Sequence, residues 1–188
     1  LATLEDPSGE ADVVTVDVSA SQDEVSWVLT SYIVAAAIMT PLAGWLSDRL
    51  GRRNLLLIGV AGFTTASLLC GIATSLPEMV LFRVMQGIFG ATLAPLAQAI
   101  MLDINPREKM GQAMAIFAMG IMVAPIVGPT LGGLLTENLG WRWVFLVNLP
   151  VGILAFAALF FNMPKETIKI RRFDFFGFAM LAIAIAAL

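Results

Sequence analysis

The stretch that decides the fold is Gly44-Trp-Leu-Ser-Asp48-Arg49-Leu-Gly51-Arg52-Arg53, a short charged segment between two long apolar runs. Each run is long enough to cross the hydrocarbon core of a bilayer, which takes about 20 apolar residues in a helix. Three arginines in so short a connection are typical of a loop on the cytoplasmic side of a membrane. The stretch therefore predicts a protein whose chain crosses the bilayer more than once.

The composition of the chain supports the same class. Apolar residues make up 59% and charged residues 13% of the 188 residues, and the mean hydropathy is +0.87, outside the soluble globular range. Acidic residues outnumber basic ones by 14 to 11, so no nucleic-acid partner is expected. Cys70 is the single cysteine and histidine is absent. A disulfide framework, a metal site and a bound cofactor are therefore not expected, and proton chemistry falls to carboxylates or arginine.

Five apolar runs are long enough to span a membrane, and a sixth begins at Phe175. They cover roughly residues 27–46, 55–74, 79–102, 111–135 and 143–161. Ser75-Leu-Pro77-Glu78 has the form of a capping box with proline in the first turn, so the third helix should begin there. These runs divide the chain into an acidic segment outside the membrane (1–24), a five-helix body (25–162), a cytoplasmic linker (163–174) and the start of another helix (175–188).

The basic residues predict the orientation of the helices. Nine of the 11 fall in alternate loops: Arg49, Arg52 and Arg53; Arg107 and Lys109; and Lys165, Lys169, Arg171 and Arg172. By the positive-inside rule these loops face the cytoplasm. Residues 1–26 carry no Lys or Arg but seven of the 14 acids, so this segment should lie outside.

Arg83 is the one ionisable residue well inside a predicted span. An arginine in hydrocarbon is costly unless it faces a cavity or a partner, so its first interpretation is functional. The alternative is that its side chain extends to the outer headgroups. Gln86, Gly87 and Gly90 share its helical face, which suits a polar, closely packed stripe.

A stripe of small residues marks the next span. Gly120, Ala124, Gly128 and Gly132 recur every four residues, which makes a flat face for another helix. Pro125 and Pro129 remove backbone hydrogen bonds beside that face and permit a bend. The residues themselves indicate a packing role.

Three of these segments resemble motifs of the major facilitator superfamily. The stretch from Gly44 to Arg53 resembles its signature loop between helices 2 and 3 and matches every defining position. The run Leu81-Phe-Arg83-Val-Met-Gln86-Gly87 is similar to the helix 4 motif, whose arginine is implicated in proton coupling. Gly128-Pro129-Thr-Leu-Gly132-Gly133 is similar to the end of the helix 5 motif that marks antiporters, although Ala115 and Ala124 stand where the family pattern has glycine.

A fourth segment narrows the resemblance. Trp141-Arg142-Trp143-Val-Phe-Leu-Val-Asn148-Leu-Pro150-Val-Gly152 resembles the start of helix 6 in drug:proton antiporters with fourteen helices, the EmrB/QacA type. The short connection before the sixth run also looks like that group. The aromatic pair equally fits an interfacial belt, and Asn148 and Pro150 equally fit polar packing and a kink.

The resemblance implies an all-α integral membrane protein with a partial major facilitator fold, comprising helices 2–6 and the start of helix 7. It implies a proton-coupled exporter of hydrophobic or amphipathic compounds in the inner membrane, and not an enzyme. Asp48, Arg49 and Arg53 would form a cytoplasmic latch, Arg83 would couple protons, and the stripe from Gly120 to Gly133 would be a hinge and packing surface. A periplasmic adaptor and an outer-membrane channel are partners that the resemblance admits in a double-membrane cell.

Two alternatives from other classes remain open. One is a solute transporter of the same fold without proton coupling, and the other is a fragment or scaffold that transports nothing. The family's helix 1 carries an acidic residue, and nothing in residues 1–20 matches that helix. We therefore expect a fragment of the N-terminal half of a transporter, and the acid that accepts the proton is not identified among the predicted spans.

Overall fold

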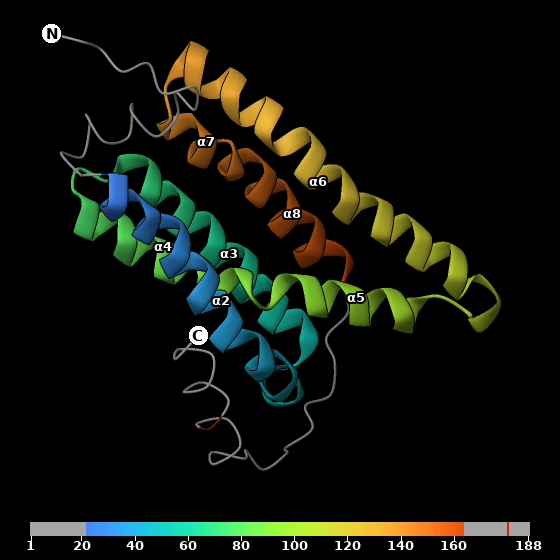
Figure 1. Ribbon diagram of the computed structural model, residues 1–188. Helices are drawn as coiled ribbons and strands as arrows, with labels where there is room; N and C mark the ends of the chain where they lie inside the picture. The colour runs from blue at the N-terminus through green and yellow to red at the C-terminus, as the bar shows by residue number, and fades with distance from the viewer. Residues whose placement is uncertain (1–21, 164–179, 181–188) are drawn as a thin grey trace, which may run out of the picture.

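The computed structural model describes residues 22–163 and Met180, and the regular structure in these residues is helical (Figure 1). The helices are α2 (Gln22–Leu50), α3 (Arg52–Ile72), α4 (Leu76–Gly90), α5 (Leu93–Ile104), the 3-10 turn η1 (Arg107–Lys109), α6 (Met110–Leu139), α7 (Arg142–Leu146) and α8 (Asn148–Asn162). The predicted acidic segment, linker and sixth apolar run lie almost entirely outside the described residues. Residues 22–24 of that acidic segment begin α2.

Five helical segments are long and apolar enough to cross a membrane, as predicted. They are Ser26–Leu50, Arg52–Ile72, Leu76–Ile104, Arg107–Leu139 and Arg142–Asn162. Each begins before the apolar run from which it was predicted, and four of the five also end after it; the second ends at Ile72, two residues short of the predicted end at residue 74. The third begins where the sequence predicted, with Ser75 as N-cap and Pro77 in the first turn. The capping differs in detail, since the Glu78 carboxylate accepts hydrogen bonds from the Thr74 N–H and hydroxyl, each at 3.0 Å.

Two of the predicted spans are interrupted where the sequence suggested continuous helices. The third breaks at residues 91–92 between α4 and α5, and the fifth breaks at Val147 between α7 and α8. Pro95 and Pro150 follow these breaks within the first turn of the next helix. Proline has no N–H for the carbonyl four residues earlier, which weakens the helix at that point.

The helices α2, α3, α4 and α8 form the packed part of the molecule (Figure 1). α4 packs against both α2 and α3, and α3 also packs against α8. One buried cluster lies at the end of the bundle near the α6–α7 turn and consists of Val28, Cys70, Ala73, Met79, Trp141 and Phe145. A second cluster of Leu55, Leu56 and Leu96 lies near the α2–α3 turn. We call the end with Arg52 and Arg53 the basic end and the other the opposite end.

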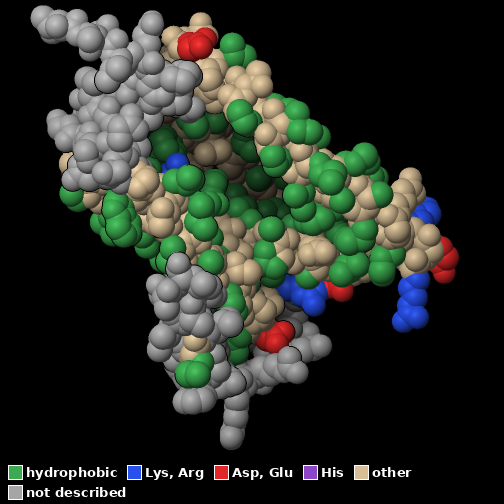
Figure 2. Space-filling model, in the orientation of Figure 1, with side chains coloured by type: hydrophobic (Ala, Val, Ile, Leu, Met, Phe, Trp, Pro, Cys, Tyr) green, Lys and Arg blue, Asp and Glu red, His purple; other side chains and the backbone are tan. Residues whose placement is uncertain are grey.

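Helix α6 stands apart from this packed group over most of its length (Figure 1). Its main contacts are with α5, η1 and α7, its neighbours along the chain. Ala113 is the buried residue of α6, and residues 118–131 are exposed throughout. Figure 2 shows a recess between α6 and the rest of the molecule, bordered largely by hydrophobic side chains.

Candidate functional site

The turn between α2 and α3 consists of one residue, Gly51. The sequence predicted a tight charged loop between apolar runs that end at Leu46 and resume at Leu55; in the structure α2 continues to Leu50 and α3 begins at Arg52. Residues 45–50 contain no glycine or proline, and Gly51 has a φ of 80°, a conformation that glycine adopts readily and other residues rarely. The Gly51 N–H donates to the Ser47 carbonyl and its own carbonyl accepts from Leu55, both at 3.0 Å. The arginines of this motif are therefore held on helix ends.

Arg52 pairs with Asp103, which the sequence reasoning missed. The ion pair joins the first residue of α3 to the last turn of α5. The side chains are 35% and 57% exposed, so the pair lies at the rim of the basic end. The sequence did contain a signal for this pair. Asp103 directly follows the apolar run 79–102, which ends on the same side of the membrane as the arginine motif.

Arg53 connects the same motif to the end of α8. Its guanidinium donates a hydrogen bond of 2.8 Å to the Phe160 carbonyl and lies 5.3 Å from the centre of the Phe160 ring. Carbonyls in the last turn of a helix lack partners within the helix, so a cation there is well placed. In α2, Arg49 lies 5.3 Å from the Trp45 ring centre and Asp48 is half-buried.

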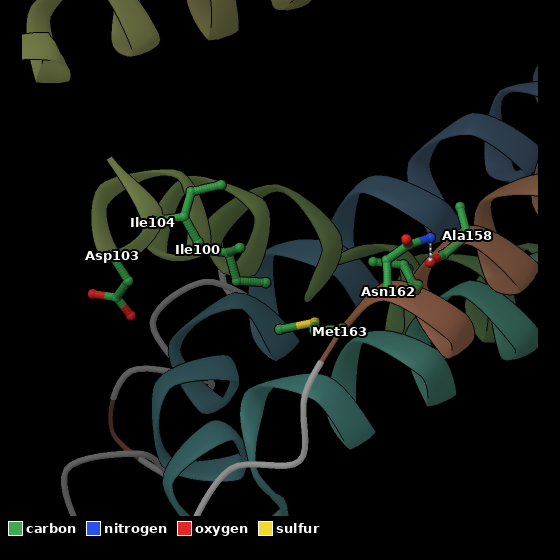
Figure 3. Close-up of a pocket in the computed structure, with 7 residues that line it drawn as sticks. Ile100, Asp103, Ile104, Ala158, Asn162 and Met163 are labelled. Carbon is green, nitrogen blue, oxygen red and sulfur yellow. Dashed lines mark hydrogen bonds between the residues drawn. The ribbon is translucent and has the colours of Figure 1, made fainter. Parts of the chain in front are cut away.

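A small pocket lies between α5 and α8 at the basic end (Figure 3). Its lining residues are Ile100, Asp103, Ile104, Ala158, Leu159, Asn162 and Met163. The Asn162 amide donates to the Ala158 carbonyl of its own helix at 2.8 Å. The volume is about 270 Å³, below the range typical of drug-sized ligand sites. This pocket is better explained as a gap between helices than as a substrate site.

Arg83 lies half-buried in α4, toward the opposite end of the bundle. The centres of the Phe145 and Tyr32 rings lie 4.7 and 5.7 Å from its guanidinium carbon, so the cation faces aromatic rings from α7 and α2. Its Nη1 donates to the Gln86 side-chain oxygen at 3.1 Å. Its buried Nε has no hydrogen-bond partner among the described residues. Arg83 therefore faces the interior of the helix group.

The predicted neighbours of Arg83 are brought together with it. Gln86 is 2% exposed and donates to the Ser67 hydroxyl in α3 at 2.7 Å. Gly87 lies at a close contact between α4 and α2: a Cβ added there would be 2.5 Å from the Tyr32 carbonyl oxygen. The sequence placed Gln86 and Gly87 on the right face but gave no sign of Ser67.

The predicted helix 6 motif divides between core and surface. Trp141 is buried and meets Phe145 edge to face at 6.2 Å, whereas Trp143 is 45% exposed, as an interfacial residue would be. Arg142 lies 4.6 Å from the Trp141 ring centre and donates to the Ala73 carbonyl at 3.2 Å, which ties α7 to α3. Asn148 and Pro150 open α8, half-buried and exposed respectively.

The small-residue stripe of α6 faces open space within the described part of the chain. A Cβ added at Gly120, Gly128 or Gly133 would meet no atom within 4 Å. Ala124 and Pro129 are exposed and Gly132 is half-exposed. The packing role of this stripe therefore stays a prediction.

Comparison with known proteins settles the family. Residues 10–187 match the family model of the Major Facilitator Superfamily. The chain belongs to the major facilitator superfamily. Members of this superfamily are transporters rather than enzymes, and the chain is a multi-pass membrane protein. Within residues 22–163, no three cysteine or acidic side chains gather as a metal site would require.

The similar sequences include the MdtD proteins, named for multidrug resistance. The chain is 45% identical to MdtD of Cronobacter sakazakii and 42% identical to that of Salmonella typhi, each over 161 residues. These matches cover 86% of this chain and 34% of each relative, so the chain spans about a third of the length of the curated relatives it matches.

Solved structures of transporters share the fold. A bacterial homologue of the human lysosomal transporter Spinster, in an inward-facing state, superposes with a TM-score of 0.66 at 23% identity, over 88% of this chain and 40% of its own. The inward-open xylose transporter XylE of E. coli gives a TM-score of 0.71 at 16% identity, over 96% of this chain and 50% of its own. At these identities the likeness concerns the fold alone.

Proposed function

We propose that the chain is part of a proton-coupled exporter of hydrophobic or amphipathic compounds, working by alternating access in the inner membrane. The observation that carries the proposal is the position of Arg83. A guanidinium is held inside a membrane-spanning helix group by Gln86 and two aromatic rings, with its Nε unpartnered among the described residues. A cation in the membrane interior is costly, so such residues are rare and usually mark a substrate or ion pathway. The similarity to multidrug resistance proteins suggests the substrate class.

The basic end is the cytoplasmic latch in this proposal. Arg52 and Arg53 begin α3 and hold the ends of α5 and α8, so one helix start is tied to two other helices. Asp48 and Arg49 lie on the last turn of α2, next to Gly51. Alternating access requires such end contacts to form in one state and open in another. A change of Asp48 to Asn should lower export if the latch operates.

The remaining parts of the proposal concern the intact protein and are taken from the resemblance to drug:proton antiporters. The intact protein has fourteen helices, and the α6 stripe from Gly120 to Gly133 is a hinge and packing surface of an antiporter. The chain's five described spans are then helices 2–6. Export ends in the periplasm, or passes to a periplasmic adaptor and an outer-membrane channel.

Dye export tests the proposal. The longest reading frame that contains this chain is expressed in an efflux-deficient host, and export of a lipophilic cationic dye is followed with and without a proton uncoupler. We expect export that the uncoupler abolishes. Export that survives the uncoupler would favour a transporter without proton coupling, and absence of export would favour a chain that transports nothing.

Two arginine variants sharpen this experiment. Arg83→Ala should remove the uncoupler-sensitive part of export, because the buried cation is lost. Arg107→Ala is the matched control, since Arg107 is exposed in η1 and its loss removes the same charge from the surface. Equal uncoupler-sensitive export by the Arg83→Ala and Arg107→Ala variants would rule out coupling through Arg83.

A further inference from the structure

A continuous chain of side-chain hydrogen bonds leads from Arg83 into the interior of α3. Arg83 donates to the Gln86 oxygen at 3.1 Å, the Gln86 amide nitrogen donates to the Ser67 oxygen at 2.7 Å, and the Ser67 hydroxyl donates to the Phe63 carbonyl at 2.8 Å. Ser67 is 0% exposed and Gln86 is 2% exposed. The bond between Gln86 and Ser67 links α4 to α3 and joins residues that are 19 positions apart in the sequence.

The chemistry of these groups allows only one assignment of donors and acceptors along this series of hydrogen bonds. A guanidinium can only donate, so the Gln86 atom that faces Arg83 is the amide oxygen. The amide nitrogen then faces α3, where it needs an acceptor because the site is buried. Ser67 has one proton, and that proton goes to the Phe63 carbonyl, so its oxygen is free to accept. The orientation of Gln86 therefore depends on Ser67.

A buried serine that bonds the carbonyl four residues earlier is common in membrane helices and needs no function. Thr65, an exposed residue of the same helix, makes a bond of the same kind, with its hydroxyl donating to the Ala61 carbonyl at 2.8 Å. Ser67 differs because it also accepts a hydrogen bond from another helix, from a residue that itself holds an interior arginine. A serine that only fills space in the helix packing would not need this second hydrogen bond from Gln86.

We infer that Ser67 is a positioning residue for Arg83 that acts through Gln86. The inference rests on the proposed function, in which Arg83 couples export to protons. With Nε unpartnered and two rings as other neighbours, the Gln86 oxygen is the polar contact that the structure gives the Arg83 side chain. Without Ser67, the Gln86 nitrogen loses its acceptor and the amide turns to find another, which releases Arg83.

The test compares Ser67→Ala with Thr65→Ala in the longest reading frame that contains this chain. Each change removes one hydroxyl that bonds the carbonyl four residues earlier in α3, and expression level and monodispersity in detergent show that each variant folds. We expect Ser67→Ala to lower the maximal rate of uncoupler-sensitive export about three- to tenfold, as loss of one hydrogen bond would. The substrate KM should stay unchanged, and Thr65→Ala should behave as wild type.

Two further variants separate positioning from packing. Ser67→Thr keeps the hydroxyl and should therefore keep the maximal rate of uncoupler-sensitive export near that of the unmutated protein. In a Gln86→Leu background, Ser67→Ala should have no further effect, because the residue through which it acts is absent.

The outcomes distinguish failure of the inference from failure of the proposed function. If the unmutated protein shows no uncoupler-sensitive export, the proposed function is overturned and the inference with it. If the unmutated protein exports and Arg83→Ala abolishes coupling, but Ser67→Ala matches Thr65→Ala, the inference alone is overturned. A rise in KM with an unchanged maximal rate in Ser67→Ala would also overturn it.

Discussion

Replacing Gly87 with alanine should force α2 and α4 apart. The added Cβ would lie 2.5 Å from the Tyr32 carbonyl oxygen, 3.0 Å from the Ala35 Cβ and 3.2 Å from the Ala36 nitrogen. Two of these atoms are backbone and the third is a Cβ without rotamer freedom, so relief requires movement of α2 itself. Overpacking of this kind costs about 1–3 kcal/mol, whereas alanine gains up to about 1 kcal/mol over glycine in a helix. We expect a net loss of about 1–2 kcal/mol.

The matched control is Gly111→Ala in α6, where an added Cβ would meet no atom of the described chain within 4 Å. That variant should be unchanged or gain up to about 1 kcal/mol from helix propensity. The free energy of unfolding is measured for both variants in mixed micelles with increasing SDS, followed by far-UV circular dichroism. If Gly87→Ala proves as stable as Gly111→Ala, α2 and α4 do not approach as closely as the structure has them.

Three further experiments test the basic end by the same unfolding measurement. A double-mutant cycle of Arg52→Ala and Asp103→Ala should give a coupling of about 0.2–1 kcal/mol, since the pair is partly exposed, and zero coupling would show that the pair does not stabilise the basic end. Gly51→Ala should cost about 1–2 kcal/mol because φ is positive while the space around the Cβ is open, and an unchanged stability would contradict that backbone conformation. Arg53→Lys should cost about 0.5–1.5 kcal/mol, since lysine keeps the charge but not the planar group that bonds the Phe160 carbonyl and faces its ring; full stability in this variant would show that charge alone suffices.

The spans could be predicted from the sequence because length and hydropathy alone determine them. The five helices lie where the apolar runs predicted, and Ser75 is the N-cap of the third. The interruptions at residues 91–92 and at Val147 were not predicted, although Pro95 and Pro150 were visible in the sequence. A proline in a membrane helix is tolerated in some contexts and breaks the helix in others, depending on the neighbouring helices.

The candidate site could be predicted only where its residues share one helix. Arg83, Gln86 and Gly87 are within five positions of one another, so helical spacing placed them together. Ser67 and Asp103 were missed because their roles depend on contacts between helices, and one sequence does not give those contacts. The single-residue turn at Gly51 was missed for a different reason. The apolar runs end at the charged residues, but charged residues do not themselves end a helix.

The most direct test of proton-coupled export is proton movement driven by the substrate. The purified product of the longest reading frame is reconstituted in liposomes containing a pH-sensitive dye, with no pH gradient imposed, and a lipophilic cation is added outside. The proposal predicts that protons move opposite to the substrate, and that the Arg83→Ala variant transports without this proton movement. Substrate uptake by the unmutated protein with no change in internal pH would contradict it.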